Sequence, residues 1–392
     1  MGSSIAIFWP GAFIFGFPGV MGPYWQKVLH VGKGPIGNTL FFVLAALGIF
    51  MFFVGRWQEK FGTRIMITIG AVICGLSSTI VAYASNILIL YLWAFLIGLS
   101  SCFIYIPALT TVQRWYPGRK GFVSGVVNMA FGLSGAVMSP VFAHMLESMD
   151  YISLNILLAI IALVVGIAAA QFTEIPERMG LQRPESEPHE KPSAGLRVSL
   201  TVGQSVRTKS FWLLWLTWAL QGAAGISMVT LSTAFGLSRG LTMESAVIIL
   251  TVFNITNGFS RISMGYFSDI IGRNSIMSIT FFAAGCAYFA LPHVTSLGAS
   301  AVLAAIIGFA FGTLFAVSAP LAADCFGLKH FGAILGLVFT AYGFVSGAIG
   351  PSLSGYILDV SNGNFMIVFV YLGIFCVLSG FFIRFVLPPQ AE

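Results

Sequence analysis

The sequence predicts an all-α membrane protein with twelve transmembrane helices in two six-helix bundles. Three observations lead to this prediction: the composition, a series of twelve apolar spans, and an internal repeat. Of the 392 residues, 57% are hydrophobic and only 8% are charged. A soluble domain carries roughly 25% charged residues, so this composition is typical of a protein that crosses the membrane many times.

The apolar residues fall into twelve stretches of about 20 residues, each long enough to cross the hydrocarbon core as a helix. The predicted spans are 4–27, 37–57, 65–84, 87–111, 121–145, 153–173, 210–238, 244–266, 274–295, 299–323, 332–357 and 364–386. The connections are short except for one charged, proline-containing segment. The chain therefore divides into an N-terminal six-helix bundle (1–173), a central loop (174–208) and a C-terminal six-helix bundle (209–392).

The distribution of Lys and Arg predicts which side each loop faces, because these residues are concentrated in cytoplasmic loops. With both termini in the cytoplasm, fifteen of them lie in inner loops and three, Lys27, Lys33 and Arg239, in outer loops. We therefore expect a multi-pass protein of the plasma membrane, the inner membrane in a bacterium. The formal net charge of +6 follows from this topology and does not indicate nucleic-acid binding.

An internal repeat relates the two halves. Gly55, Glu59 and Gly62 recur 210 residues later as Gly265, Asp269 and Gly272. Gly121, Gly125, Gly132 and Pro140 recur 211 residues later as Gly332, Gly336, Gly343 and Pro351. A unit with an even number of spans keeps its orientation when duplicated. Parallel halves with a substrate site between them, near the membrane midplane, are typical of a large class of secondary transporters.

Arg261 is the residue that most directly indicates a binding site. It lies inside the apolar stretch 246–266, and a guanidinium stays protonated in proteins. Placing it near the bilayer centre costs at least about 3 kcal/mol. No acidic residue stands at comparable depth, so an anion from outside is the natural partner. The alternative is a structural arginine that is bonded to backbone carbonyls.

Several segments resemble a known family. Gly55–Arg64 resembles the signature loop of the major facilitator superfamily, with Glu59 where an aspartate is usual, and Gly265–Arg273 occupies the equivalent loop of the second half. Arg114–Gly132 is similar to the helix 4–5 loop of oxalate/formate antiporters and monocarboxylate transporters, and Phe17-Pro18 resembles helix 1 of the latter. Arg261 stands where that family places its substrate-binding arginine. The resemblance implies the major facilitator fold and transport by alternating access.

Three positions depart from the pattern of these families. Asn257 replaces the aspartate that monocarboxylate transporters have four residues before the arginine, and Gly19 replaces their lysine after Phe-Pro. Both changes remove groups of that family's proton-relay route. Tyr342 stands where the oxalate carriers have a second cation, which argues against a dianionic substrate.

A single fixed cation favours a single carboxylate, which arginine binds through two parallel hydrogen bonds. A second carboxylate would leave a charge unpaired at low dielectric. The preferred cargo is therefore a small monocarboxylate such as L-lactate, pyruvate or acetate.

Other polar residues could contribute to this site. Asn257 shares a helix face with Arg261 and could orient the guanidinium or bond a hydroxyl or keto oxygen; the alternative is an interhelical hydrogen bond. Tyr105, Tyr342 and Asn128 could also bond the substrate, or could serve in packing alone. The predicted cavity wall, with the same alternative, adds Phe17, Phe131 and Phe339.

The loop charges Glu59, Arg64, Asp269 and Arg273 are predicted to lock the two halves together in one state, the alternative being ordinary solvated charges. No Asp or Glu lies deep in a span, so a proton could travel with the substrate carboxylate. The prediction, taken mainly from the resemblance, is symport of a proton with one monocarboxylate; the alternative is exchange of two carboxylates.

Other function classes are disfavoured. No nucleophile–base pair or metal-ligand grouping is apparent, so the sequence predicts no enzyme activity, cofactor or metal. A P-loop is also absent, so ATP is not the expected energy source. The expected partners are the monocarboxylate, the proton and the lipid bilayer. A channel or sensor is disfavoured by the parallel duplication.

Overall fold

Twelve membrane-spanning helices make up the fold, as a computed structural model of the chain describes it over residues 1–116, 120–180, 200–327 and 330–388, apart from the side chains at 59, 120, 121, 177 and 178. The first half contains α1 (Gly2–Phe15), α2 (Phe17–Leu29), α3 (Lys33–Phe61), α4 (Thr63–Ala82), α5 (Ile87–Trp115), α6 (Lys120–Ser148) and α7 (Tyr151–Gln171). The second half contains α9 (Lys209–Ser238), α10 (Met243–Ile271), α11 (Arg273–Ala290), α12 (Leu297–Phe326), α13 (Phe331–Thr340), α14 (Leu353–Val360) and α15 (Phe365–Arg384). The predicted all-helical fold is confirmed.

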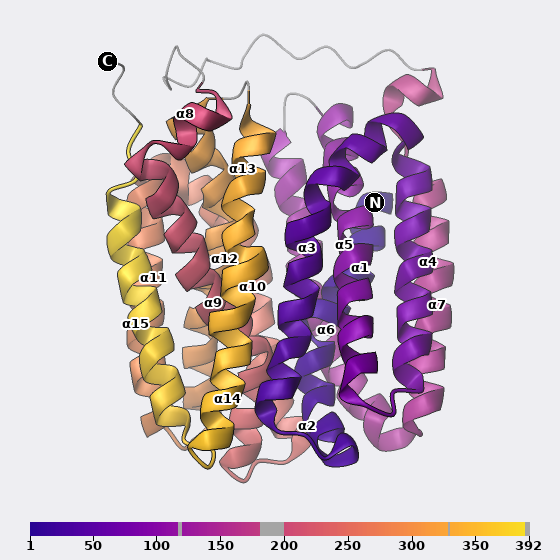
Figure 1. Cartoon of the computed structure of the whole chain (residues 1–392), viewed down its shortest axis with the longest axis vertical. Helices are drawn as coiled ribbons and strands as arrows, with labels where there is room; N and C mark the ends of the chain where they lie inside the picture. The colour runs from indigo at the N-terminus through magenta and orange to yellow at the C-terminus, as the bar shows by residue number, and fades with distance from the viewer. Residues whose placement is uncertain (117–119, 181–199, 328–329, 389–392) are drawn as a thin grey trace.

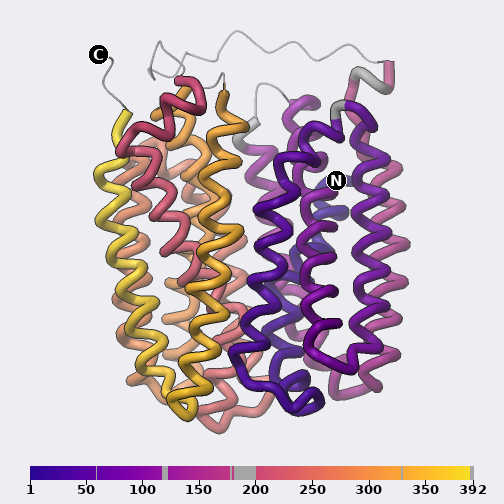
Figure 2. Tube along the Cα trace, in the orientation of Figure 1, coloured from indigo at the N-terminus to yellow at the C-terminus, as the bar shows by residue number. Residues whose placement is uncertain are grey.

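The two halves stand side by side as separate bundles, the first in indigo to purple and the second in red to yellow (Figures 1 and 2). We call the upper end of the view in Figure 1 the loop face; it carries the turn between α3 and α4 and the short helix α8 (Val202–Val206). The opposite face carries the ends of α2 and α14. All twelve spans run between these two faces.

One pair of the repeated glycines has a conformational cause. Gly62, between α3 and α4, has φ +89°, and Gly272, between α10 and α11, has φ +95°. Positive φ values in this range are readily adopted by glycine and disfavoured for other residues. The same tight turn therefore occurs at the equivalent place in both halves, as the duplication predicts.

Two of the spans are interrupted. The first span breaks at Gly16 into α1 and α2, and Pro18 occupies the first turn of α2, where its missing N–H is tolerated. The eleventh span joins α13 to α14 through π-helical turns at Ala341–Ser346 and Ala348–Ser352. Such wide turns are frequent at functional sites, and the first of them contains Tyr342.

Glycines allow the helices of the two halves to approach backbone to backbone. A Cβ atom at Gly343 would lie 2.7 Å from the Cα of Gly48, and one at Gly37 would lie 2.1 Å from the carbonyl oxygen of Pro351. No side chain fits at such distances. Near the loop face, a Cβ atom at Gly55 would have no heavy atom from outside its own stretch of helix within 4 Å. The closest packing of α3 against the eleventh span therefore extends from mid-height to the opposite face.

Asp359, at the end of α14, joins the two halves at the opposite face. Its two carboxylate oxygens accept hydrogen bonds from the backbone N–H groups of Lys33 (2.7 Å) and Gly34 (2.8 Å) at the start of α3. The ammonium of Lys33 also lies 5.1 Å from the ring centre of Phe365 in the second half. These contacts tie the start of α3 to the second half at this face.

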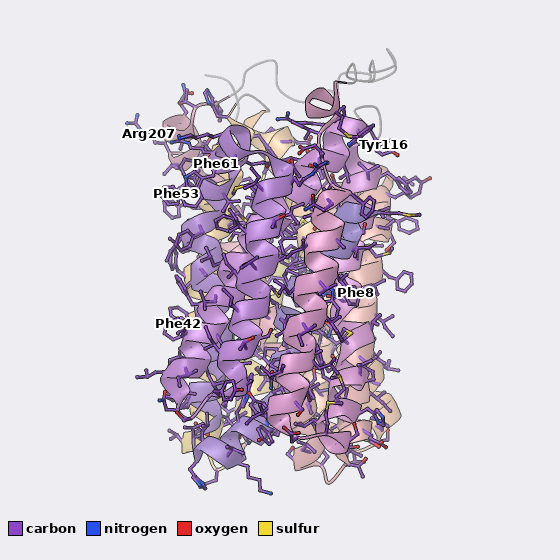
Figure 3. The ribbon with its side chains drawn as sticks, turned by 90° about the vertical axis from the view of Figure 1, so that its right-hand side faces the viewer. Phe8, Phe42, Phe53, Phe61, Tyr116 and Arg207 are labelled. Atoms are coloured by element: carbon purple, nitrogen blue, oxygen red, sulfur yellow. The ribbon has the colours of Figure 1, made fainter. Side chains whose placement is uncertain are left out.

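The outer surface of the bundle is largely apolar. Phe53 and Phe61 project from the side of the first half (Figure 3) and are 46% and 44% exposed. Such exposed rings on membrane-spanning helices suit contact with lipid chains. The polar residues that carry the site lie inside, between the two halves.

Candidate functional site

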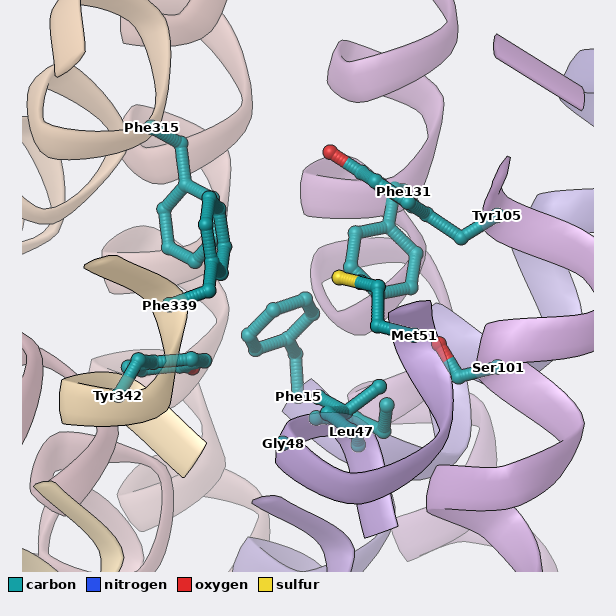
Figure 4. A pocket seen from close by; sticks show the side chains of 11 residues that line it. Phe15, Leu47, Gly48, Met51, Ser101, Tyr105, Phe131, Phe315, Phe339 and Tyr342 are labelled. Carbon is teal, nitrogen blue, oxygen red and sulfur yellow. The ribbon is translucent and has the colours of Figure 1, made fainter. Parts of the chain in front are cut away.

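A small cavity of about 30 Å³ lies between the two halves. Figure 4 shows Phe315, Phe339 and Tyr342 on one side and Tyr105 and Phe131 on the other, so both halves contribute to its wall. The lining residues are Ile14, Phe15, Leu47, Gly48, Met51, Ser101, Tyr105, Phe131, Phe315, Phe339 and Tyr342. The wall is mainly aromatic and aliphatic, and three side-chain hydroxyls interrupt it.

Arg261 lies behind this aromatic wall. Its side chain projects from α10 and is only 3% exposed. The guanidinium carbon is 4.3 Å from the ring centre of Phe315, 5.6 Å from that of Phe15 and 5.7 Å from that of Phe131. All three rings line the cavity. Rings from both halves therefore surround the buried cation.

The hydrogen bonds of the guanidinium are long. Nε and Nη2 each donate to Oδ1 of Asn257 at 3.3 Å, and Nη1 donates to the backbone oxygen of Asn128 at 3.5 Å. N–H···O bonds in proteins usually measure about 2.9–3.0 Å. Among the described residues, no carboxylate forms an ion pair with Arg261. The cation is therefore held weakly by neutral oxygens and can accept an anion.

Two tyrosines from opposite halves flank the cavity and differ in their hydroxyl contacts. The Tyr105 hydroxyl donates to Oδ1 of Asn128 at 2.6 Å, which links it to the same residue that accepts from Arg261. The Tyr342 hydroxyl makes no hydrogen bond to any residue that the structure describes. A ligand could therefore bond Tyr342 without displacing a protein partner. The Nδ2 donor of Asn257 is buried and also unpartnered within the described ranges.

Small residues make room for Arg261 where α6 crosses α10. A Cβ atom at Gly258 would lie 2.5 Å from Cγ of Leu133, and one at Gly132 would lie 3.1 Å from Nε of Arg261. The crossing therefore depends on glycine in both helices. It places the guanidinium next to the backbone of the other half.

The structure brings together seven of the predicted site residues: Arg261, Asn257, Asn128, Tyr105, Tyr342, Phe131 and Phe339. It does not bring Phe17 to the cavity. The Phe17 ring is fully buried inside the first half, against Trp25, Trp93 and Phe142. The sequence reasoning missed Phe15 and Phe315, which contact the guanidinium.

At the loop face, Arg273 forms ion pairs within the second half. Arg273 pairs with Asp324 at 3.0 Å and with Asp269 at 3.6 Å. Arg64 is exposed, and the side chain of Glu59 lies outside the described residues. That these charges lock the two halves together in one state stays a prediction.

Comparison with known proteins agrees with this architecture. A family model described as Major Facilitator Superfamily matches residues 4–342 and 248–392. The oxalate:formate antiporter of Oxalobacter formigenes is 25% identical over 305 residues, which cover 76% of this chain and 71% of that protein. Monocarboxylate transporter 11 of Homo sapiens is 25% identical, with 84% of this chain and 70% of that protein covered.

A solved structure supports the fold alone. It is the inward-facing, occupied form of a bacterial homologue of the human lysosomal transporter Spinster. It matches with a TM-score of 0.71 at 13% identity, over 97% of this chain and 93% of that one. The family model, which matches nearly the whole chain, confirms the resemblance inferred from the signature loops, and the chain belongs to the major facilitator superfamily.

Proposed function

We propose that this protein is a secondary active transporter of small monocarboxylates and that Arg261 is its anion site. The observation that carries the proposal is the buried guanidinium at the junction of the halves, with long hydrogen bonds and no carboxylate partner among the described residues. A cation in that position costs at least about 3 kcal/mol in a membrane. A substrate carboxylate would supply both the missing charge and two parallel hydrogen bonds.

The wall of the cavity supports a monocarboxylate over a dicarboxylate. L-lactate, pyruvate or acetate would place its carboxylate on Arg261 and its methyl group against the rings. The hydroxyl or keto oxygen of the first two could meet Tyr342 or Nδ2 of Asn257. A second carboxylate, as in oxalate, would face apolar rings and the neutral Tyr342, at a large desolvation cost. The names of the relatives point to carboxylates as a class.

Alternating access follows from the position of the site between two bundles. The count of Lys and Arg assigns the loop face to the cytoplasm. We propose, mainly from the resemblance to monocarboxylate transporters, that a proton crosses with the carboxylate. None of the residues that line the cavity is an Asp or Glu, so the proton would travel on the substrate and not on a side chain of the cavity wall. The second candidate is carboxylate exchange, which the oxalate:formate antiporter favours as a relative.

Uptake into proteoliposomes tests the proposal. Labelled L-lactate, pyruvate and acetate would be offered with and without an inward proton gradient, to the wild type and to Arg261→Gln. Uptake driven by the gradient should fall at least about tenfold in the variant, because the charge-assisted hydrogen bonds are lost. Arg384→Gln, which removes an exposed charge, is the control. Uptake only into vesicles preloaded with carboxylate would indicate exchange, and equal uptake by Arg261→Gln and wild type would contradict the site.

A further inference from the structure

We infer that Phe315 allows the unloaded carrier to return across the membrane, because its ring offsets the charge of Arg261 when no substrate is bound. The inference rests on the proposed function, with Arg261 as the anion site. A carrier that moves net substrate must reorient once per cycle without cargo. An obligate exchanger never does so, because it always reorients with an anion in place.

We call the reorientation of the empty carrier the unloaded step and that of the carrier with substrate the loaded step. The unloaded step is limited by electrostatics. During it, only groups of the protein can offset the buried guanidinium of Arg261. Within the described ranges these groups are neutral oxygens at 3.3 Å or more and the three surrounding rings. The face of an aromatic ring carries partial negative charge and attracts a cation within about 6 Å of its centre. Phe315, at 4.3 Å, is the nearest of the three rings.

Phe315 differs from the other two rings because it moves with Arg261. Phe15 and Phe131 belong to the first half, which changes position relative to α10 during alternating access. Phe315 lies on α12, in the same half as α10. Its contact with the guanidinium is therefore kept when the two halves rock as rigid bodies.

Close glycine packing fixes α12 on α10. A Cβ atom at Gly312 would lie 2.2 Å from the carbonyl oxygen of Asn257, so the two backbones touch there. Phe315 follows Gly312 by three residues, and Arg261 follows Asn257 by four, which places both one turn beyond the contact. The ring of Phe315 is held from behind by Trp218 (5.0 Å between ring centres) and Phe311 (5.3 Å).

The ring acts more strongly on the unloaded carrier than on the loaded one. A ring face attracts the charge of Arg261 without occupying any of its N–H donors, so a carboxylate can still bind. Once the carboxylate is bound, the pair is nearly neutral and gains little from the ring. Removing the ring should therefore slow the unloaded step and spare the loaded step.

The test compares two transport modes of one variant, Phe315→Leu, in proteoliposomes. Net uptake into substrate-free vesicles requires the unloaded step, whereas exchange with saturating unlabelled L-lactate on both sides does not. In Phe315→Leu we expect net uptake to fall about tenfold and exchange to stay within about twofold of the wild type. Phe315→Tyr keeps the ring face and should keep the wild-type ratio of net uptake to exchange.

Leu47→Ala is the control, because Leu47 lines the same cavity from the first half and has no ring to place against Arg261. Its ratio of net uptake to exchange should equal that of the wild type. If Phe315→Leu has the wild-type ratio of net uptake to exchange, whether or not both rates fall, the inference is overturned. A wild type that only exchanges would also overturn the inference, but it would leave Arg261 as the proposed anion site. If Arg261→Gln transports like the wild type, the proposed function itself fails.

Discussion

At the scale of single residues, the site combines one charge with neutral partners. Asn257 lies one turn before Arg261 and offers its amide oxygen to two guanidinium nitrogens. An amide orients the cation without cancelling its charge, whereas a carboxylate in that place would form an internal ion pair. The positive charge of Arg261 therefore stays available to a ligand. The remaining donors around the cavity decide which ligand is held best.

Tyr342→Phe should weaken substrate binding. The Tyr342 hydroxyl has no hydrogen-bond partner in the described ranges, so it can donate to a carboxylate, and such bonds contribute about 1.5–3 kcal/mol. We expect KM for L-lactate uptake to rise roughly tenfold or more. Tyr105→Phe is the comparison, because its hydroxyl already donates to Asn128 and should affect KM less. An unchanged KM in Tyr342→Phe would show that the hydroxyl does not contact the substrate.

The residues of the candidate site were predictable in proportion to how unusual they are in an apolar helix. Arg261 and Asn257 stand out by charge, polarity and spacing. Phe15 and Phe315 do not, because the chain has 37 phenylalanines and no sequence pattern distinguishes a ring that faces a guanidinium from one that faces lipid. For Phe17 the packing alternative holds, because its ring lies against Trp25 and Phe142 inside the first half.

At the scale of helices, the positions of the spans were predictable, whereas their ends were predictable only to within a few residues and their irregularities were not. The predicted span 87–111 corresponds to α5, Ile87–Trp115. The π-helical turns in the span predicted at 332–357 leave no trace in an apolar pattern, because they shift the helical register without changing composition. The carboxylate of Asp359 looks like a loop charge in the sequence. Its partner, the start of α3, is 326 residues away.

Asp359→Ala should loosen the opposite face. The substitution removes both acceptors that hold the first N–H groups of α3 to the second half, and these groups favour a nearby negative charge. The measurement is the labelling rate of a cysteine introduced at Thr230, which lines a small pocket between the halves beside Lys33. Intact cells and a membrane-impermeant maleimide would be used, with the exposed Cys286 replaced by serine. We expect severalfold faster labelling in Asp359→Ala.

Asp150→Ala is the matched control for that experiment. Asp150 also caps a helix, accepting from the N–H of Ser153 at 2.8 Å, but both residues belong to the first half. Its loss should leave the labelling rate at Thr230 unchanged. If Asp359→Ala and the wild type label equally fast, Asp359 does not hold the halves together.

At the scale of the whole molecule, composition and duplication were enough to predict the architecture. Twelve apolar spans and a repeat with an even number of them require two parallel bundles. The sequence could not predict how the two bundles pack against each other. That packing depends on contacts such as Gly48 with Gly343, which join segments far apart in the chain.

The orientation in the membrane can be tested by labelling from outside. Single cysteines at Gln204, on the loop face, and at Asn362, next to α14, would be introduced into the Cys286→Ser background; both positions are exposed. The excess of Lys and Arg predicts a cytoplasmic loop face. An impermeant maleimide should therefore label Asn362→Cys in intact cells and Gln204→Cys only after permeabilisation. The reverse pattern would contradict the topology.

The backbone contacts between α3 and the eleventh span also determine how a drug could reach this protein. Because Gly37 meets Pro351 without space for a single methyl group, a compound in the surrounding medium cannot pass between α3 and the eleventh span at that level. An inhibitor that reached the cavity from the loop face would not have to pass this contact. With that face in the cytoplasm, as the count of Lys and Arg predicts, membrane permeability of the compound, rather than its affinity alone, would limit its potency in living cells.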